Sequence, residues 1–341
     1  GARHRDDHRR ADRGQARPLL AGAGQARRLL RRAATAGGAR AGRPAAASVD
    51  LPEHGGPLRR HLALQLLDLR EAPKAHVGKH LADRVAAGHS VQGIDAVAGS
   101  GLQVDLTDAG QVYGALAGAD AVVHMGAWAN AGMVPDARTY GDNTAGTYNV
   151  FQACADLGVR RVVSASSNQV YGFFSAPPLY APIDEAHPTR PVNSYALSKL
   201  AGEQAAEYFS RTRGMEILSF RIMGVRVPSE LPGDIAQIKS NEGGATKLLW
   251  TRSDARDVAI ACRLAVEVER VESGEYNITG PRVVLEAETR ELLARYCPST
   301  EVREGLVGAA APLSCQKARR AFGYQPRYAW SEHAYHLEDN E

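Results

Sequence analysis

After residue 78 the chain repeats one pattern four times: a helical stretch, then a short apolar run. The stretches and the runs that follow them are 79–87 and 90–95, 108–119 and 120–127, 147–158 and 160–167, and 194–212 and 216–222. Short apolar strands alternating with such helices are typical of βαβ units, which build a parallel sheet covered on both faces. The pattern therefore predicts an α/β fold with a doubly wound parallel sheet, whose ligands bind beyond the carboxyl ends of the strands.

Residues 1–70 lack the side chains that build a core. They contain no Ile, Phe, Tyr, Trp or Met, whereas fifteen alanines and fifteen arginines make up much of the segment. Its net charge is +9, against −6 for residues 71–341. Three interpretations stay open: an arginine-rich arm for nucleic acid or an anionic surface, a transit peptide, or a wrongly framed or misannotated start. We favour the last, because G+C-rich codons yield Ala, Arg, Gly and Pro in any frame, and we expect a disordered or aberrant arm.

The composition of the whole chain excludes several classes of protein. The net charge of +3 over 341 residues argues against a nucleic-acid partner for the chain as a whole. Neither an apolar run of membrane-spanning length nor a secretory signal occurs, so no membrane association is expected. The four cysteines show neither CxxC spacing nor pairing density, which favours reduced thiols in a cytoplasmic protein.

The start of the predicted sheet departs from the pattern of a dinucleotide-binding fold, which needs a strand, a glycine-rich turn and a helix. Counting back from Gly78 in steps of three, the other glycine positions hold Ala72 and Ala75, with Pro73 between them. Glycine is wanted there because the turn is tight and the backbone approaches the pyrophosphate closely. Residues 61–70 have strand-like content only in part, so we expect the first strand and its turn to be missing or degraded.

Two acidic positions suit the adenosine half of a dinucleotide. Asp95 ends the run 90–95, where a carboxylate takes the ribose hydroxyls and favours NAD over NADP. Asp105 and Leu106 are candidates to seat the adenine amino group, although an aspartate that caps the next helix would look identical. Each signal is weak alone, but their order and spacing fit a dinucleotide site.

The strongest chemical signal is the pair Tyr195 and Lys199, four residues apart on one helical face, preceded by Ser166-Ser167 at a strand end. A nearby ammonium and a positive cofactor ring favour tyrosinate, so the pKa of the phenol is expected to fall toward neutrality. Tyr195 can then act as a base, and Ser167 can hydrogen-bond the same substrate oxygen.

From about Val77 to its end, the sequence resembles the extended short-chain dehydrogenase/reductase superfamily, in particular the NAD-dependent epimerase/dehydratase group. VVHMGA, residues 122–127, resembles the strand end at which Gly126 lies close to the cofactor. DNTAGTYNV, residues 142–150, resembles the helix whose Asn143 supports the active site, and SSNQVYG carries the serine that matches the catalytic one, Ser167.

This resemblance implies a Rossmann-like NAD-binding domain over residues 71–220 and a small substrate-binding portion over residues 221–341. It implies NAD as the cofactor and a homodimer formed through the helix that carries Tyr195. Ser167, Tyr195 and Lys199 are the implied catalytic residues, with Lys199 also on the cofactor ribose. The residues expected to contact the cofactor are Val77, Gly78, Asp95, Asp105, Leu106, Gly126, Asn143, Tyr195 and Lys199.

Departures from the family pattern narrow the chemistry. Sugar dehydratases of the group follow the serine or threonine with Asp-Glu as acid and base, whereas this chain has Asn168-Gln169, so dehydration is not expected. The Ser-Ser-Asn sequence is more similar to the hexuronate dehydrogenases of the group, in which the Asn touches the sugar. Asn168 is therefore a candidate substrate ligand, with Arg226 as the nearest candidate for a substrate-binding arginine.

A tryptophan and a pair of histidines are two further candidate site features. Trp128 is expected to face the substrate cleft and stack on a sugar ring, with packing in the core as the alternative. His76 and His80 have metal-ligand spacing but no carboxylate or cysteine partner, so no metal is expected. The sequence thus predicts an NAD-dependent sugar oxidoreductase or epimerase, and the alternative is a non-catalytic, dinucleotide-binding member of the same fold.

Overall fold

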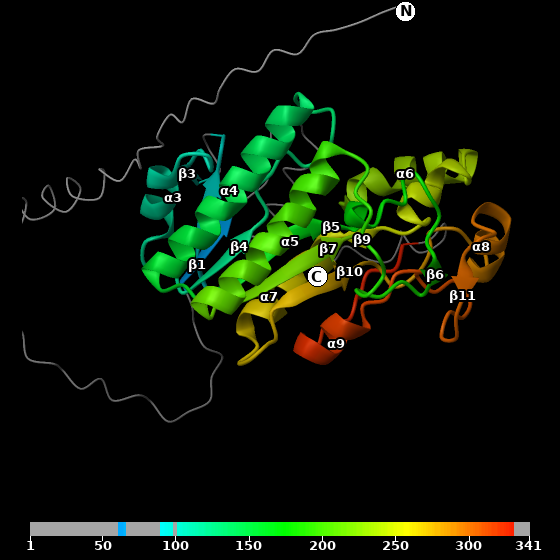
Figure 1. The fold of residues 1–341 in the computed structure, drawn as a ribbon. Helices are drawn as coiled ribbons and strands as arrows, with labels where there is room; N and C mark the ends of the chain where they lie inside the picture. The colour runs from blue at the N-terminus through cyan, green and yellow to red at the C-terminus, as the bar shows by residue number, and fades with distance from the viewer. Residues whose placement is uncertain (1–60, 66–88, 98–100, 331–341) are drawn as a thin grey trace, which may run out of the picture. The chain divides into compact units, whose positions relative to one another are not determined.

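The computed structural model describes residues 61–65, 89–97 and 101–330, which all belong to one compact unit, residues 56–341. Seven strands form one sheet in the order β10-β7-β5-β4-β1-β2-β3, and every pairing is parallel. Helices α3, α4 and α5 cover one side of the sheet, and α7 and α9 cover the other (Figure 1). The predicted doubly wound α/β sheet is confirmed.

The strands of the sheet are β1 (His61–Gln65), β2 (Ser90–Asp95), β3 (Leu102–Gln103), β4 (Ala121–His124), β5 (Arg161–Ser167), β7 (Glu216–Ile222) and β10 (Gly274–Ile278). The helices are α3 (Ala109–Leu116), α4 (Asp136–Leu157), α5 (Ser194–Arg213), α6 (Leu231–Ser240), α7 (Ala255–Glu267), α8 (Thr289–Tyr296) and α9 (Gln316–Phe322). Short strands are β6 (Tyr180–Ala181), β8 (Val225–Arg226), β9 (Ser253–Asp254) and β11 (Glu301–Val302), and 3-10 turns are η1 (Asn168–Tyr171), η2 (Pro228–Glu230) and η3 (Gly244–Leu248).

Successive residues of the central strands belong to opposite layers of the core. Val122 and Val162 pack with α3, α4 and α5, whereas the next residues, Val123 and Val163, pack with α7 and α9. Side chains alternate across a strand, so a strand covered on both faces must be apolar throughout. This is why the strands appear in the sequence as continuous apolar runs.

Residues His61–Gln65 form β1, the strand between β2 and β4 in the sheet. The expectation that the first strand is missing is therefore wrong. The segment HLALQ holds no β-branched residue, so its strand content was weak, and two neighbouring strands decide its conformation instead. The glycine-turn positions Ala72, Pro73 and Ala75 lie outside the described residues, as do Val77, Gly78, His76, His80 and all of the expected arm 1–70 except β1.

The C-terminal portion shares in the sheet. The boundary expected between residues 220 and 221 falls inside β7, and β10 and α7 pack into the core of the sheet. A second core, which includes the fully buried Trp250, gathers residues of η1, α6 and α8. The portion after residue 220 is thus built on the sheet and is continuous with it.

Helix ends follow local capping signals. Asn193 caps α5 by accepting a hydrogen bond from the Ala196 N–H at 2.8 Å, and Gly214 ends the helix in the left-handed region. Helix α4 begins at Asp136, eleven residues before the expected 147, and ends at Gly158 with φ 82°. Its early start carries Arg138, Asp142 and Asn143 into the helix, and all three matter for the site.

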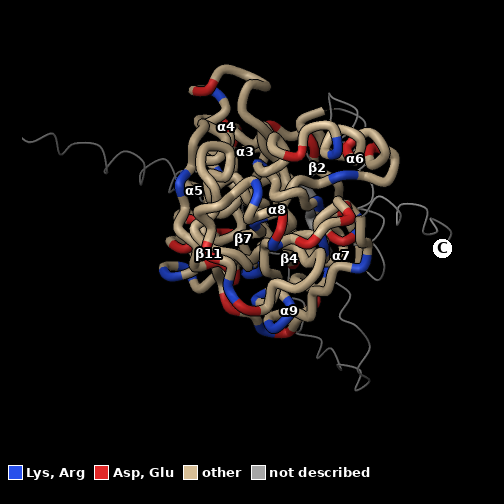
Figure 2. Tube along the Cα trace, turned by 90° about the vertical axis from the view of Figure 1, so that its right-hand side faces the viewer, with Lys and Arg blue, Asp and Glu red and all other residues tan. Residues whose placement is uncertain are grey.

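Basic and acidic residues are interspersed along the described trace (Figure 2). Helix α9, for example, has Arg319 and Arg320 in its last turn, whereas α4 and α8 begin with acidic residues. None of the helices in the described ranges has the length and apolar character needed to cross a membrane.

Candidate active site

Two cavities open at the carboxyl edge of the sheet, where a doubly wound fold is expected to bind ligands. The first cavity has a volume of about 550 Å³ and the second of about 290 Å³. Both are lined by residues that follow strand ends, and Ala127, just after β4, lines both. The two cavities therefore meet at Ala127.

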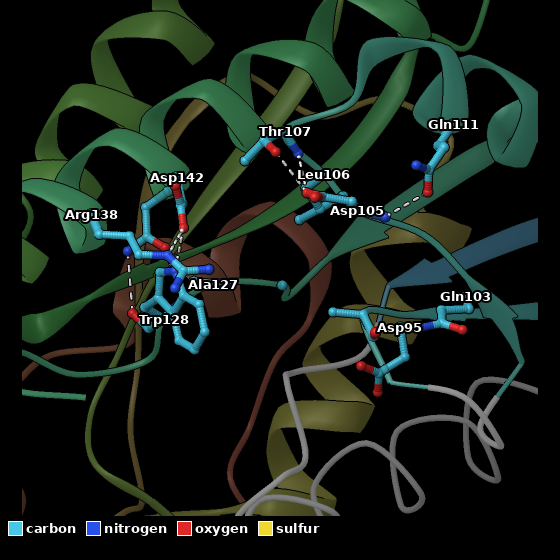
Figure 3. Close-up of a pocket in the computed structure, with 13 residues that line it drawn as sticks. Asp95, Gln103, Asp105, Leu106, Thr107, Gln111, Ala127, Trp128, Arg138 and Asp142 are labelled. Carbon is cyan, nitrogen blue, oxygen red and sulfur yellow. Dashed lines mark hydrogen bonds and ion pairs between the residues drawn. The ribbon is translucent and has the colours of Figure 1, made fainter. Parts of the chain in front are cut away.

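The predicted site residues divide between these cavities. The first cavity is lined, among others, by Asp95, Asp105, Leu106, Gly126, Trp128 and Asn143 (Figure 3). The second cavity is lined, among others, by Ser167, Asn168, Tyr195, Lys199 and Arg226. Every predicted site residue within the described part of the chain thus lines one cavity or the other.

Helix α5 presents Tyr195 and Lys199 to the second cavity, one turn apart. Lys199 Nζ donates to the Ala165 carbonyl at 2.8 Å and lies 5.7 Å from the centre of the Tyr195 ring. The phenol also hydrogen-bonds the Ser167 hydroxyl at the end of β5. One helix and one strand end thus bring the three predicted catalytic side chains together.

Burial dominates the titration of this group. Desolvation raises the pKa of Tyr195 to about 12, although the hydrogen bond with Ser167 opposes the rise. Desolvation also lowers the pKa of Lys199 to about 8. The expected fall of the phenol pKa toward neutrality is therefore not produced by the protein's own groups, and a further positive charge beside Tyr195 would be needed.

The Asn168 amide is the one side chain of the second cavity that is buried there without a partner among the described residues. Asn168 is 2 % exposed, and its Nδ2 has no hydrogen-bond acceptor there. A buried amide without an acceptor costs about 1–3 kcal/mol, so such a group points to a ligand. An oxygen-rich ligand in this cavity would satisfy it.

Gln169, the next residue, is fixed by its neighbours. Its Oε1 accepts from Asn193 Nδ2 at 3.1 Å, and its Nε2 donates to Asn130 Oδ1 at 3.4 Å. An amide held between two other amides cannot supply the proton transfer of an acid or a base.

A basic group lies on another wall of the second cavity. Arg226 Nε is 3.4 Å from Asp234 Oδ1, and the buried Arg252 hydrogen-bonds both oxygens of the same carboxylate. Two guanidinium groups share one aspartate. Glu230 also lines the cavity, but its Oε2 accepts from the Val227 N–H at 3.0 Å.

The acidic residues of the first cavity have the chemistry that adenosine requires. Asp95, 2 % exposed, accepts from the Val97 N–H at 3.1 Å. Asp105 accepts from the backbone and hydroxyl of Thr107 through Oδ1, and its Oδ2 has no donor among the residues that the structure describes. Asp108, and not Asp105, caps α3 through the Gln111 N–H. Ribose hydroxyls and an adenine amino group are donors that fit these oxygens.

Helix α4 holds the walls of the first cavity through one face. Asn143 accepts from the Trp128 N–H at 2.8 Å and donates to Ser198 Oγ on α5 at 3.0 Å. A Cβ at Gly146 would lie 2.8 Å from the Leu106 Cβ, so only glycine allows this close approach. Asn149 donates to the Leu106 carbonyl at 2.9 Å. The sequence motif signalled Asn143, but the contacts of Gly146 and Asn149 required the fold.

Trp128 lies on the wall of the first cavity, and not on that of the second as expected for a sugar-stacking residue. Its indole N–H donates to Asp142 Oδ2 at 2.8 Å, and the Arg138 guanidinium lies 5.2 Å from the ring centre. These contacts with α4 hold the ring on the wall of the first cavity.

A buried ion pair ties α5 to the sheet and was missed in the sequence. Glu203 accepts from Arg221 through both oxygens, at 2.9 and 2.7 Å, and from Ser166 Oγ at 2.7 Å. Arg221 also donates to the Tyr171 hydroxyl at 3.1 Å. Glu203 follows Lys199 by four residues, so helical spacing could have indicated Glu203. No signal in the sequence indicated its partner on β7.

Comparisons with known proteins support this assignment of the fold. A uronate dehydrogenase of Pseudomonas putida is 34% identical over 121 residues, which cover 36% of this chain and 43% of that protein. The L-arabinose 1-dehydrogenase (NAD(P)(+)) of Haloferax volcanii is 31% identical over 162 residues, which cover 43% of this chain and 62% of that protein. The chain thus spans about two fifths to three fifths of the length of these relatives.

A solved structure is similar over more of the chain. It is a short-chain dehydrogenase/reductase superfamily protein from Agrobacterium tumefaciens with bound NAD, with a TM-score of 0.59 and 22% identity. The similarity covers 79% of this chain and 93% of that one, and it establishes the fold. The model of the NAD dependent epimerase/dehydratase family matches residues 74–279. The chain therefore belongs to the NAD dependent epimerase/dehydratase family, and its cofactor is NAD.

Proposed function

We propose that this chain is an NAD-dependent sugar oxidoreductase that oxidises a hydroxyl group of a hexuronate or a similar anionic monosaccharide. The observation that supports this most is the unpartnered Asn168 amide, buried in the cavity that also holds Ser167 and Tyr195. Uronate dehydrogenases are among the relatives of the chain. Epimerisation of a sugar by the same three residues is the alternative.

In the proposed reaction, Tyr195 as phenolate accepts the proton of the substrate hydroxyl, and Ser167 hydrogen-bonds the same oxygen. NAD+, when bound, supplies the hydride acceptor. The carbinol carbon loses hydride and becomes a carbonyl, so two electrons leave with the hydride and one proton passes to Tyr195. Lys199, held by the Ala165 carbonyl, keeps a positive charge near the phenolate because a pKa of about 8 leaves it mostly protonated at pH 7.

The proposed preference for an anionic sugar rests on Arg226, which lines the second cavity. Its guanidinium shares Asp234 with Arg252, so this carboxylate faces two positive charges, while the Glu230 carboxylate of the same cavity accepts from the Val227 N–H. Arginine is well suited to bind a carboxylate because its planar fork matches the two oxygens. A hexuronate carboxylate on Arg226 would leave the sugar hydroxyls for Asn168 and Ser167.

The proposal is tested by incubating the full chain and NAD+ with hexuronates, neutral aldoses and nucleotide sugars, while NADH absorbance and sugar products are followed. The proposal predicts NADH formation with hexuronates. Isomerised sugar without net NADH would support the epimerase alternative. NAD+ binding without conversion of any sugar in the set would point to a non-catalytic member of the fold.

Replacing Arg226 with glutamine is expected to raise KM for hexuronate about tenfold or more, the loss typical of a charge-assisted hydrogen bond. Values of kcat/KM for neutral sugars should change little, so the preference for the acid should fall. R226K keeps the charge but loses the planar fork, so its KM for hexuronate should lie between those of the natural chain and R226Q. An unchanged KM for hexuronate in R226Q would remove Arg226 from the substrate site.

A homodimer is the proposed assembly, formed through α4 and α5. These neighbouring helices expose several large apolar side chains, each at least 40% exposed: Tyr140, Tyr148, Leu157, Leu197 and Tyr208. Exposed apolar side chains on two neighbouring helices suit a twofold interface between copies. The double variant Tyr148→Glu, Leu197→Glu is expected to elute as a monomer in light-scattering chromatography where the natural chain is a dimer. A monomeric natural chain would contradict the assembly.

A further inference from the structure

Arg138 is the feature of the first cavity that the proposed function leaves unused. It lies in the first turn of α4 and lines this cavity beside Asp142 and Trp128 (Figure 3). We propose that Arg138 binds the pyrophosphate of the dinucleotide, oriented by Asp142 and Trp128. This inference rests on the assignment of the two cavities to the two halves of NAD and the sugar.

The guanidinium is oriented on one side and open on the other. Arg138 Nε donates to Asp142 Oδ2 at 3.0 Å, and the Trp128 indole N–H donates to the same oxygen at 2.8 Å. The guanidinium carbon lies 5.2 Å from the centre of the Trp128 ring, within the range of a cation–π contact. No hydrogen bond joins the two terminal nitrogens to the residues that the structure describes. They remain available as a pair of donors.

The charges that line the first cavity indicate that the two terminal nitrogens of Arg138 bind an anion. The first cavity is lined by three carboxylates, Asp95, Asp105 and Asp142, and by one cationic side chain among its described lining residues, Arg138. Carboxylates suit the hydroxyl and amino donors of adenosine but repel phosphate. Arginine binds phosphate oxygens through its fork. Arg138 is thus the lining side chain with the chemistry for phosphate.

The position of Arg138 agrees with the order of groups along a dinucleotide. Ala127 lines both cavities, and Trp128, the next residue, carries the Arg138 guanidinium over its ring. In NAD the pyrophosphate lies between the adenosine and the nicotinamide riboside. If adenosine occupies the wall of Asp95 and Asp105 and the nicotinamide lies near Tyr195, the pyrophosphate must pass the junction at Ala127. Arg138 lies beside that junction.

The chain offers a matched control on α5. Arg211 pairs with Glu207 through the same Nε contact, at 3.0 Å and with i,i+4 spacing, and both Arg211 and Arg138 are more than half exposed. Arg211 lines neither of the two cavities. Replacing either arginine with glutamine removes the same charge from the surface of a helix. A difference in NAD+ affinity between the two variants would therefore be due to the position of Arg138 in the first cavity.

The experiment measures binding by the full chain and by the variants Arg138→Gln, Arg138→Lys and Arg211→Gln. NAD+, NADP+ and ADP-ribose are titrated by calorimetry, and adenosine by NMR chemical shifts. R138Q is expected to bind NAD+ and ADP-ribose about tenfold more weakly and adenosine unchanged, with R138K intermediate and R211Q like the natural chain. The affinity of the natural chain for NAD+ should also fall with salt more steeply than that of R138Q.

Four outcomes overturn the inference. Unchanged NAD+ binding in R138Q would show that Arg138 does not contact the cofactor. An equal loss of affinity for adenosine would show that Arg138 contacts the adenosine and not the pyrophosphate. A loss for NADP+ alone would assign it to a ribose phosphate. If the natural chain does not bind NAD+, the proposed function fails as well, whereas the first three outcomes leave that function intact.

Discussion

Replacing Tyr195 with phenylalanine is expected to lower kcat for sugar oxidation by about 10²- to 10⁴-fold, the usual contribution of a general base. The phenol is the only group of this residue that hydrogen-bonds Ser167, and the ring remains to fill the same space beside Lys199. The loss should therefore appear in kcat, while the affinity for NAD+ and the unfolding midpoint stay close to those of the natural chain. Initial rates of NADH formation measure this.

The pH profile gives a second readout for Tyr195. Burial raises the pKa of this phenol to about 12, and the reaction needs its deprotonated form, so the rate of the natural chain should rise with pH. In Y195F this rise should disappear. A variant that retains more than a tenth of the natural kcat with an unchanged pH profile would show that another group takes the proton.

Replacing Glu203 with glutamine is expected to lower the free energy of unfolding by about 3–5 kcal/mol, the cost of leaving one partner of a buried ion pair alone. Arg221 and Glu203 are 6% and 3% exposed, and both guanidinium contacts with the carboxylate are direct. The amide keeps the shape of the side chain but not its charge, so Arg221 would stay buried without a counter-charge. Chemical denaturation at equilibrium measures the change.

Two further variants separate this effect from general damage to α5. Glu207→Gln removes an exposed partner of an arginine on the same helix, and should change the stability by no more than about 0.5 kcal/mol. The double variant Glu203→Gln, Arg221→Met should be more stable than E203Q alone, because it removes the unpaired charge. Equal stability of E203Q and E207Q would contradict a structural role for the pair.

Strand positions were predictable because the sheet is covered on both faces. Residues 90–95 and 216–222 are observed as β2 and β7 with the predicted bounds. In β7 the apolar residues Ile217, Leu218 and Phe220 are buried, as expected for a strand covered on both faces. The strand β1 was not predictable in the same way. Its alanine and leucines favour no strand, and its conformation depends on pairing with β2 and β4, which are distant in sequence.

The site was predictable where one segment carries the chemistry. Tyr195 and Lys199 share a helix, and Ser167 and Asn168 share a strand end, so spacing placed the members of each pair together. The resemblance to the family placed the two pairs in one site. The side of Ala127 on which Trp128 lies was not predictable, because it depends on the contacts of the indole with Arg138 and Asp142, which only the fold brings together. The partner of Glu203 was not predictable either, because helix α5 and strand β7 come into contact only in the fold.

A crystal structure of the full chain with NAD+ bound would show directly whether the two cavities hold one cofactor. We expect one dinucleotide that spans both cavities, with adenosine between Asp95 and Asp105 and the pyrophosphate at Ala127 and Arg138. Its nicotinamide should lie in the second cavity within reach of Tyr195 and Lys199. A dinucleotide bound outside these cavities, or with its nicotinamide remote from Tyr195, would contradict both the proposed reaction and the residues assigned to it.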